Sequence, residues 1–324
     1  MQNFKKIVIG CSSGGFNALK NILNPLPADF PAVILIVQHV IPKKPSPLPE
    51  LFQNYCKLKV MEPIDGQLLT PNSVFIAPSD VHMVISTTRI FLERGPKVNF
   101  SRPAIDPLFY SAALNHGSNV IGIILSGTLD DGSAGLRAIK RCGGIAIIQD
   151  IKDAKYPEMP MNASQAVSID YSIPSKLISS KLIQLTKSVT PITDNKKENE
   201  LIEIEAELNG TSKHSEVNKL EKIATPSSYS CPDCNGVLWK IKDGKVERYR
   251  CRVGHAYSLA SLETGLSLKA EEALWSALRA LEEKEQLAKK IADKAEISTR
   301  EHFVEKARNI TEHIQIIRDI LEKP

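Results

Sequence analysis

The stretch KKIVIGCSSGG, residues 5–15, decides the fold of this chain. Its apolar run, Lys6–Gly10, lacks the polar alternation of a half-exposed strand, which predicts a strand buried on both faces. The run ends in glycines, and Gly15–Leu23 then carries apolar residues at helical spacing. A buried strand that turns tightly into a helix is the opening unit of an alternating β/α chain.

The same alternation continues to about residue 185. It predicts further strands and helices, the strands over Ala32–Gln38, Ser73–Ala77, Val120–Leu125 and Gly144–Gln149, the helices over Pro107–Leu114 and Ala134–Cys142. The fold class is therefore α/β, a doubly wound and mostly parallel sheet with helices on both faces. His82–Glu93 differs, because two short apolar runs around Thr87–Thr88 predict a hairpin on the sheet edge.

Composition limits the class of protein. The 324 residues leave room for two or three domains. With 41 Lys and Arg against 37 Asp and Glu, the net charge of +4 is too small to argue for nucleic acid. The longest apolar runs, Ala32–Val37 and Val120–Leu125, are far below the roughly 18–20 residues that span a bilayer. With no signal peptide visible, the sequence predicts a cytoplasmic protein without membrane insertion.

The composition changes along the chain and predicts four segments. Residues 1–188 form the α/β domain, 189–228 a polar linker, 229–258 a small Cys/His unit, and 259–324 a helical tail. The tail has a heptad seam at Phe303, Ala307, Ile310, Ile314, Ile317 and Leu321. This seam predicts a helical hairpin whose two apolar stripes bury each other, or a coiled coil for self-association or partner binding.

The Cys/His unit has the spacing of a metal site. Cys231 and Cys234 form a Cys-x2-Cys pair, and Cys251 and His255 a Cys-x3-His pair. Three thiolates and one imidazole suit a closed, structural, tetrahedral Zn²⁺ site in a zinc-ribbon-like unit; a metal-free buried cysteine cluster is the alternative. The Lys and Arg residues of the unit are interpreted as a solvated face of alternating strands, which argues against nucleic acid.

The glycine turn also carries candidate nucleophiles. Cys11, Ser12 and Ser13 lie at the carboxyl end of the first strand, where α/β sheets open their ligand crevice. The helix that follows offers free N–H groups that stabilise an oxyanion. A phosphate or dinucleotide site, or a purely structural turn, remains open here. Against a dinucleotide, the glycines depart from G-x-G-x-x-G, and His39 replaces the acidic residue that binds a ribose.

Two further polar groups follow parallel strands. His39 comes directly after Ala32–Gln38, and Asp130 and Asp131 lie in the loop after Val120–Leu125. A serine, a histidine and an aspartate at the same edge are the components of acyl transfer: a nucleophile, a base, and a carboxylate that orients the base.

Five ordered motifs resemble the chemotaxis protein-glutamate methylesterases (the CheB catalytic domain) over about residues 3–185. They are IGCSSGG at 9–15, VQHV at 37–40, IAPSDVHM at 76–83, SRPAIDPLF at 101–109 and LSGTLDDGSAG at 125–135. The resemblance implies a Ser–His–Asp triad with the nucleophile at Ser12, the base at His39 and the orienting carboxylate at Asp131. Asp130 is then a loop or cap residue. Arg102 and His82 line the crevice, or serve as a salt bridge and a structural histidine.

The family's activity is implied on the same basis. It is hydrolysis of a glutamate methyl ester on a methylated chemoreceptor, with deamidation of glutamine as a second activity and no cofactor for catalysis. Typical members carry an N-terminal receiver domain, whereas this chain starts at the first strand of the catalytic domain and resembles stand-alone members with a C-terminal extension. The competing hypothesis is a regulatory or scaffold protein of a chemosensory system that uses the fold and tail for partner binding with little catalysis.

Overall fold

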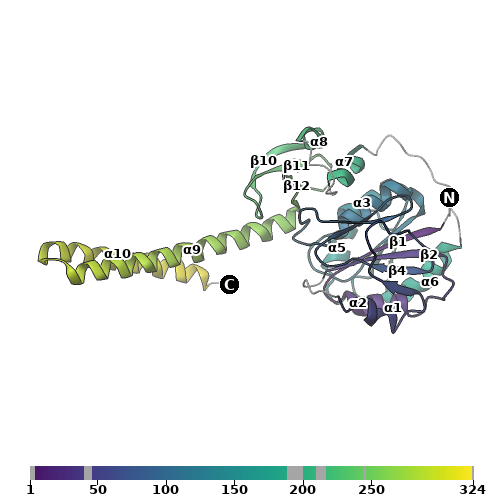
Figure 1. The fold of residues 1–324 in the computed structure, drawn as a ribbon, viewed down its shortest axis with the longest axis horizontal. Coiled ribbons are helices and arrows are strands. Elements are labelled where there is room, and N and C mark those ends of the chain that lie inside the picture. The colour runs from purple at the N-terminus through teal and green to yellow at the C-terminus, as the bar shows by residue number, and fades with distance from the viewer. Residues whose placement is uncertain (1–3, 40–45, 188–199, 209–216, 244–245, 323–324) are drawn as a thin grey trace. The chain divides into compact units, whose positions relative to one another are not determined.

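The computed structural model describes residues 4–39, 46–187, 200–208, 217–243 and 246–322. The chain divides into two compact units, Met1–Leu262 and Glu263–Pro324. The first unit holds the α/β sheet and a smaller antiparallel sheet (Figure 1).

A seven-stranded parallel sheet forms the centre of the first unit. Its strands are β1 (Lys5–Cys11), β2 (Ala32–Gln38), β3 (Lys59–Met61), β4 (Ser73–Ile76), β7 (Val120–Ile124), β8 (Ile145–Gln149) and β9 (Tyr171–Ile173). They lie in the order β3-β4-β2-β1-β7-β8-β9, and each neighbouring pair is parallel. The strand order reverses at β1, so a crevice is expected at the carboxyl ends of β1, β2 and β7.

Helices cover both faces of this sheet, as the sequence predicts. One face carries α1 (Gly15–Leu23), α2 (Leu48–Gln53) and α6 (Ser175–Thr186), and the other carries α3 (Ile105–His116), α4 (Ser133–Arg141) and α5 (Glu158–Ala166). A short 3₁₀ turn, Gly117–Asn119, leads from α3 into β7. Within β1, Val8 packs on the α3 side and Ile7 and Ile9 pack on the α1 side. Alternate residues of the strand therefore belong to two separate hydrophobic cores.

The predicted hairpin forms, but not on the edge of the main sheet. Strands β5 (His82–Ile85) and β6 (Ile90–Glu93) make a separate two-stranded sheet. It packs against α3, where the backbone N–H of Ile85 donates to Ser111 Oγ over 3.1 Å. The short strand β3 occupies the edge instead.

A four-stranded antiparallel sheet forms the Cys/His unit. It contains β10 (Ala224–Ser230), β11 (Val237–Ile241), β12 (Arg248–Cys251) and β13 (Ala256–Ser258) in that order. The pairing of β11 with β12 is the hairpin that a zinc-ribbon-like unit requires.

The segment predicted as a polar linker contains ordered elements. They are α7 (Glu200–Leu208), α8 (Val217–Ile223) and β10. Ile202 of α7 is buried in the core on the α3 side, whereas Ile204 and Leu208 pack with Trp239 of the small sheet. Helix α7 therefore joins the α/β core to the Cys/His unit.

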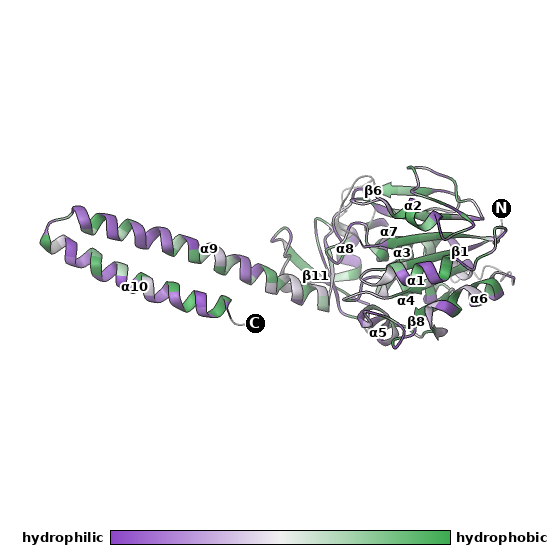
Figure 2. Cartoon of the chain, turned by 90° about the horizontal axis from the view of Figure 1, so that it is seen from below, coloured by the Kyte–Doolittle hydropathy of each residue, from purple (hydrophilic) through white to green (hydrophobic). Residues whose placement is uncertain are grey.

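The second unit is a helical hairpin. Helix α9 (Leu259–Lys294) begins in the first unit, and α10 (Ile297–Leu321) returns beside it. Leu278 packs against Ile310 and Ile314 of the predicted seam, and Figure 2 shows apolar and polar residues alternating along both helices. The two stripes bury each other, which confirms the hairpin. In the described part of the chain, no helix has the length and apolar character needed to cross a bilayer.

Candidate active site

The glycine turn presents Ser12 at the carboxyl end of β1. The backbone N–H of Ser12 donates to the carbonyl of Ser126 over 3.0 Å, and Gly15 N–H donates to the Ser12 carbonyl over 2.9 Å. Gly14 has φ 77°, which favours glycine. Ser12 is half-buried and Ser13 exposed, whereas Cys11 is fully buried. Burial raises the pKa of the Cys11 thiol, so Ser12 is the better placed nucleophile.

Ser126 holds this turn, a role that the sequence analysis missed. Its buried hydroxyl donates to the carbonyl of Ser13 over 2.8 Å and accepts from the N–H of Tyr156 over 2.9 Å. The next residue, Gly127, lies so close to the nucleophile that a Cβ there would be 2.9 Å from Ser12 Cβ. The sequence signal for Ser126 is its position just after the strand β7.

His39 and Asp131 meet at the same edge. His39 Nε2 donates to Asp131 Oδ2 over 2.9 Å, and the side chains are 18% and 3% exposed. With the Nε2 proton bound to the carboxylate, Nδ1 is the ring atom that accepts a proton.

His39 also lies beside the nucleophile turn. Cys11 pairs with Gln38 in the β1–β2 register, and the N–H of His39 donates to the Cys11 carbonyl over 3.0 Å. Ser12 and His39 are therefore the next residues along adjacent strands. Between these two described side chains, no direct hydrogen bond is formed in this structure; catalytic hydrogen bonds are often looser without substrate.

The carboxylate of Asp131 is held as an anion. Its Oδ2 also accepts from the N–H of Ile105, over 2.8 Å, and its Oδ1 accepts from Asn99 Nδ2 over 3.2 Å. Burial alone would raise the pKa of Asp131, but the hydrogen bond and charge of His39, with the Ile105 and Asn99 donors, hold it below its ordinary value. The first turn of α3 thus stabilises the charge that orients His39.

Two neighbouring carboxyl groups have other roles. Burial and then the charge of Asp131 raise the pKa of Asp106 well above its ordinary value, so the negative charge of this pair resides on Asp131. Asp130 accepts a hydrogen bond from Ser258 Oγ over 2.6 Å, so it contacts the end of β13.

Arg102 and His82 both make polar contacts with neighbouring loop residues. Arg102 forms an ion pair with Asp80 at 2.6 Å. His82 is buried, its Nε2 donates to the carbonyl of Pro96 over 2.9 Å, and its Nδ1 accepts from the N–H of Ala104 over 3.2 Å. Burial lowers the pKa of His82 to about 4, which keeps the ring neutral.

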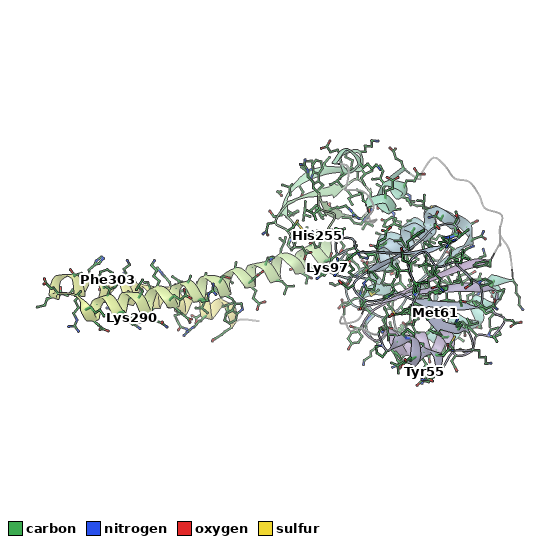
Figure 3. The ribbon with its side chains drawn as sticks, viewed as in Figure 1. Tyr55, Met61, Lys97, His255, Lys290 and Phe303 are labelled. Carbon is green, nitrogen blue, oxygen red and sulfur yellow. The ribbon has the colours of Figure 1, made fainter. Side chains whose placement is uncertain are left out.

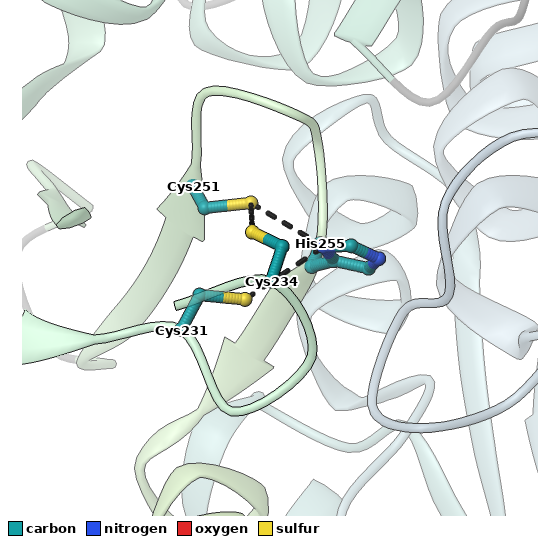
Figure 4. A group of neighbouring side chains, drawn as sticks. All are labelled: Cys231, Cys234, Cys251 and His255. Carbon is teal, nitrogen blue, oxygen red and sulfur yellow. Dashed lines mark hydrogen bonds between the residues drawn. The ribbon is translucent and has the colours of Figure 1, made fainter. Parts of the chain in front are cut away.

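The four predicted metal ligands come together. The ligand atoms of Cys231, Cys234, Cys251 and His255 all lie within 4.8 Å of one another (Figure 4). Cys234 Sγ is 3.7 Å from Cys251 Sγ, and His255 Nδ1 is 3.5 Å from Cys251 Sγ and 3.7 Å from Cys231 Sγ. A tetrahedron with Zn–S bonds of about 2.3 Å has edges of roughly 3.5–3.8 Å. The donor set and its spacing therefore fit a tetrahedral metal ion.

The basic residues of this unit are not all on a solvated face. Arg248 and Arg250 are buried, and both pair with Glu205 of α7, at 3.0 and 3.3 Å. Arg248 also pairs with Asp243, which in turn binds Arg137 of α4. The prediction of a solvated basic face was wrong for these two arginines, because α7 supplies a buried counter-charge.

Known proteins similar to this chain share the α/β part. The CheB methylesterase family model matches residues 7–182. A protein of Leptospira interrogans, named as a candidate protein-glutamate methylesterase/protein-glutamine glutaminase, is 37% identical over 187 residues, which are 57% of this chain and 97% of that relative. The protein-glutamate methylesterase/protein-glutamine glutaminase of Chromohalobacter salexigens is 39% identical over 163 residues, 49% of this chain and 46% of the relative. Among solved structures, the catalytic domain of the CheB methylesterase of Thermotoga maritima has a TM-score of 0.55 and 35% identity, covering 56% of this chain and 98% of that domain.

Proposed function

The chain belongs to the CheB methylesterase family and is a carboxylic ester hydrolase of the protein-glutamate methylesterase kind, and we propose that Ser12, His39 and Asp131 are its catalytic triad. The observation that carries this proposal is the hydrogen bond from His39 to a buried, ionised Asp131. It lies at the carboxyl ends of the parallel strands, where Ser12 directly follows β1. A nucleophile, a base and an orienting carboxylate at one strand edge suit acyl transfer.

The reaction would proceed in two steps. Ser12 Oγ attacks the ester carbonyl carbon while His39 takes the hydroxyl proton, and the same proton then passes to the leaving methoxy group, which departs as methanol. The glutamyl group remains on Ser12 as an acyl-enzyme. His39 next takes a proton from water, whose oxygen attacks the acyl carbon, and that proton passes to Ser12 as the glutamic acid side chain leaves. The acid then gives its remaining proton to solvent and becomes the carboxylate. Because the Gly15 N–H donates to the Ser12 carbonyl, we assign stabilisation of the oxyanion to the N–H groups that follow it in the first turn of α1.

The proposed substrate is a methylated glutamate on a chemoreceptor or related sensory protein, in the cytoplasm. The relatives' names add glutamine as a second substrate. Release of ammonia instead of methanol from the same acyl-enzyme step would account for that activity, so we include deamidation in the proposal.

Methanol release tests the proposal. Purified protein is incubated with a methylated chemoreceptor cytoplasmic fragment, and wild type is compared with Ser12→Ala. A matched control is Ser180→Ala, an exposed serine of α6 whose hydroxyl bonds only its own helix, at Leu177. We expect release from wild type and the control alone. Equal release from Ser12→Ala would contradict the assignment and direct attention to Cys11 and Ser13.

We also propose that Cys231, Cys234, Cys251 and His255 hold a structural Zn²⁺. Four protein ligands leave no open position, so the ion would fold the small sheet and take no part in the hydrolysis. Tyr257 supports the site from outside, with its hydroxyl 3.3 Å from Cys231 Sγ.

The helical hairpin supports a second function, binding of a partner or of another copy. Its seam is used internally, but several large apolar side chains remain exposed on both helices: Leu268, Trp275, Leu287, Val304, Ile316 and Ile320. If the chain were chiefly a scaffold with little catalysis, Ser12→Ala would leave all measurable behaviour unchanged. Sedimentation of the full chain over a range of concentrations tests the self-association.

A further inference from the structure

Asn99 connects the proposed triad to Ser258 of β13 and Ser261 of α9. Its Nδ2 donates to Asp131 Oδ1 over 3.2 Å, and its Oδ1 accepts from the N–H of Ser258, over 3.0 Å, and from Ser261 Oγ, over 2.9 Å. Asn99 is buried, so each of these bonds is costly to lose. Because Ser258 and Ser261 supply two donors to Oδ1, they fix which end of the amide faces Asp131.

Asn99 lies in a tight turn with an unusual backbone conformation. Val98 and Ser101 pair across a tight turn in which Asn99 has φ 48° and Phe100 φ 61°. Asparagine adopts this left-handed region readily, but a bulky aromatic residue does so at a cost.

Strand β13 meets this turn directly. The N–H of Asn99 donates to the carbonyl of Ala256 over 2.9 Å, and the ring of Phe100 lies 5.4 Å from that of Tyr257. Ala256 directly follows His255, and Figure 3 labels His255 close to Lys97, whose carbonyl accepts from the Ala256 N–H. The turn is therefore built against the segment that begins at a proposed metal ligand.

We propose that Asn99 is a positioning residue of the triad and that Ser258, at the end of β13, and Ser261, in the first turn of α9, set its orientation. Asn99 Nδ2 donates to Asp131 Oδ1, while Oδ2 accepts from His39 and from the N–H of Ile105. Ser258 and Ser261 thus act on the catalytic carboxylate through Asn99. The inference rests on the proposed triad.

The Asn99 amide acts on Asp131 and, through Asp131, on His39; its Nδ2 also lies 3.5 Å from Asp106 Oδ2. The titratable groups that face Asp131 are His39 after β2, Asp106 of α3, Asp130 of its own loop and His82 of β5. Removing the Asn99 donor leaves the carboxylate charge less compensated, so Asp131 attracts the proton on His39 more strongly. The acid limb of the pH profile then moves to higher pH.

The test compares Asn99→Gly and Ser261→Ala with a matched serine control. Glycine accepts the left-handed backbone of residue 99 and removes only the amide. Ser267→Ala is the control, because Ser267 is an exposed residue of α9 that bonds Glu263. We expect kcat to fall about 10-fold in Asn99→Gly and about 3-fold in Ser261→Ala, with KM within twofold, and the acid limb of kcat/KM to move to higher pH.

A second readout separates this inference from the proposed function. The chain has seven histidines, and the ring N–H signal of His39, assigned with His39→Gln, can be recorded by NMR in the full chain. We expect the signal of the Nε2 proton, which lies in the hydrogen bond to Asp131, to shift in Asn99→Gly and in Ser261→Ala, and to match wild type in Ser267→Ala. This result is expected even if no methanol is released from any substrate. An unchanged Nε2 proton signal and pH profile, with only a lower Tm, would show a purely structural role and overturn the proposal.

Discussion

Asp131 accepts hydrogen bonds from the ring of His39, the amide of Asn99 and the backbone of α3. Each donor comes from a different part of the chain, and each lowers the pKa of a carboxyl group that burial alone would raise. An anion fixed in this way holds one tautomer of His39, with Nε2 protonated and Nδ1 free to act as the base.

Asp131→Asn tests this directly. The amide keeps the size of the side chain but removes the charge, and its NH₂ group competes for the position of the Nε2 proton. We expect kcat to fall by about 10³- to 10⁴-fold while the urea midpoint changes little. A variant that retains more than a tenth of wild-type kcat would contradict the orienting role.

The proposed triad residues could be selected from the sequence because Ser12 and His39 directly follow recognisable buried strands and Asp131 lies in the loop after another. Asn99 and Ser126 could not. Asn99 acquires its role from Ser258 and Ser261, about half the chain away, and no local pattern records that contact. The burial of Arg248 was missed for the same reason, since its counter-charge, Glu205, lies in the segment interpreted as a linker.

Helix α7 contributes a buried charge between two sheets. Glu205 is 1% exposed and pairs with both Arg248 and Arg250. The sequence predicts a polar linker at this position, because glutamate alternates with apolar residues along α7 and polar segments flank it. The five long strands of the α/β sheet were predicted, since buried parallel strands form uninterrupted apolar runs. The short edge strands β3 and β9 and the helices α2, α5 and α6 were not predicted.

Glu205→Gln should undo this contact. Two buried guanidinium groups would lose their shared counter-charge, so we expect the free energy of unfolding to fall by about 3 kcal/mol. Urea denaturation measures the change, with Glu203→Gln, an exposed residue of the same helix, as the control. Equal stabilities of the two variants would show that the arginines find other partners.

The Cys/His unit should depend on its metal. Cys234→Ser removes one of four ligands, so we expect purified protein to lose its bound zinc and the β10–β13 sheet to lose hydrogen-exchange protection. Elemental analysis of the full chain, expected to give one zinc per wild-type chain, measures the first effect. Cys56→Ser, a buried cysteine outside the cluster, should keep the metal. A wild-type chain purified without metal, and fully protected in this sheet, would favour the metal-free cysteine cluster.

At the scale of the whole molecule, two buried histidines make stability depend on pH. Burial lowers the pKa of both His82 and His116 to about 4. A base whose pKa is lower in the folded state stabilises the fold above its unfolded pKa, near 6.5, and this contribution is lost as the pH falls toward 4.

His116→Gln isolates one of these contributions. The amide can still donate to the carbonyl of Ser86, which His116 Nε2 contacts at 3.0 Å. Between pH 7.5 and 5 we expect the variant to lose about 2 kcal/mol less unfolding free energy than wild type. His302→Gln, an exposed position of α10, should behave as wild type. Parallel urea titrations at the two pH values provide the comparison, and identical losses in all three proteins would contradict the assignment.

The burial of the Cys11 thiol, next to the proposed nucleophile Ser12, affects how the active site responds to oxidants. Peroxide attacks accessible thiolates, and hydrolases that rely on a cysteine nucleophile are inactivated by it. Here Cys11 is fully buried and its raised pKa keeps it protonated, while the adjacent reactive group is a hydroxyl. The nucleophile turn therefore offers an oxidant no target. Oxidative damage would begin instead at Cys234, the most exposed of the six cysteines.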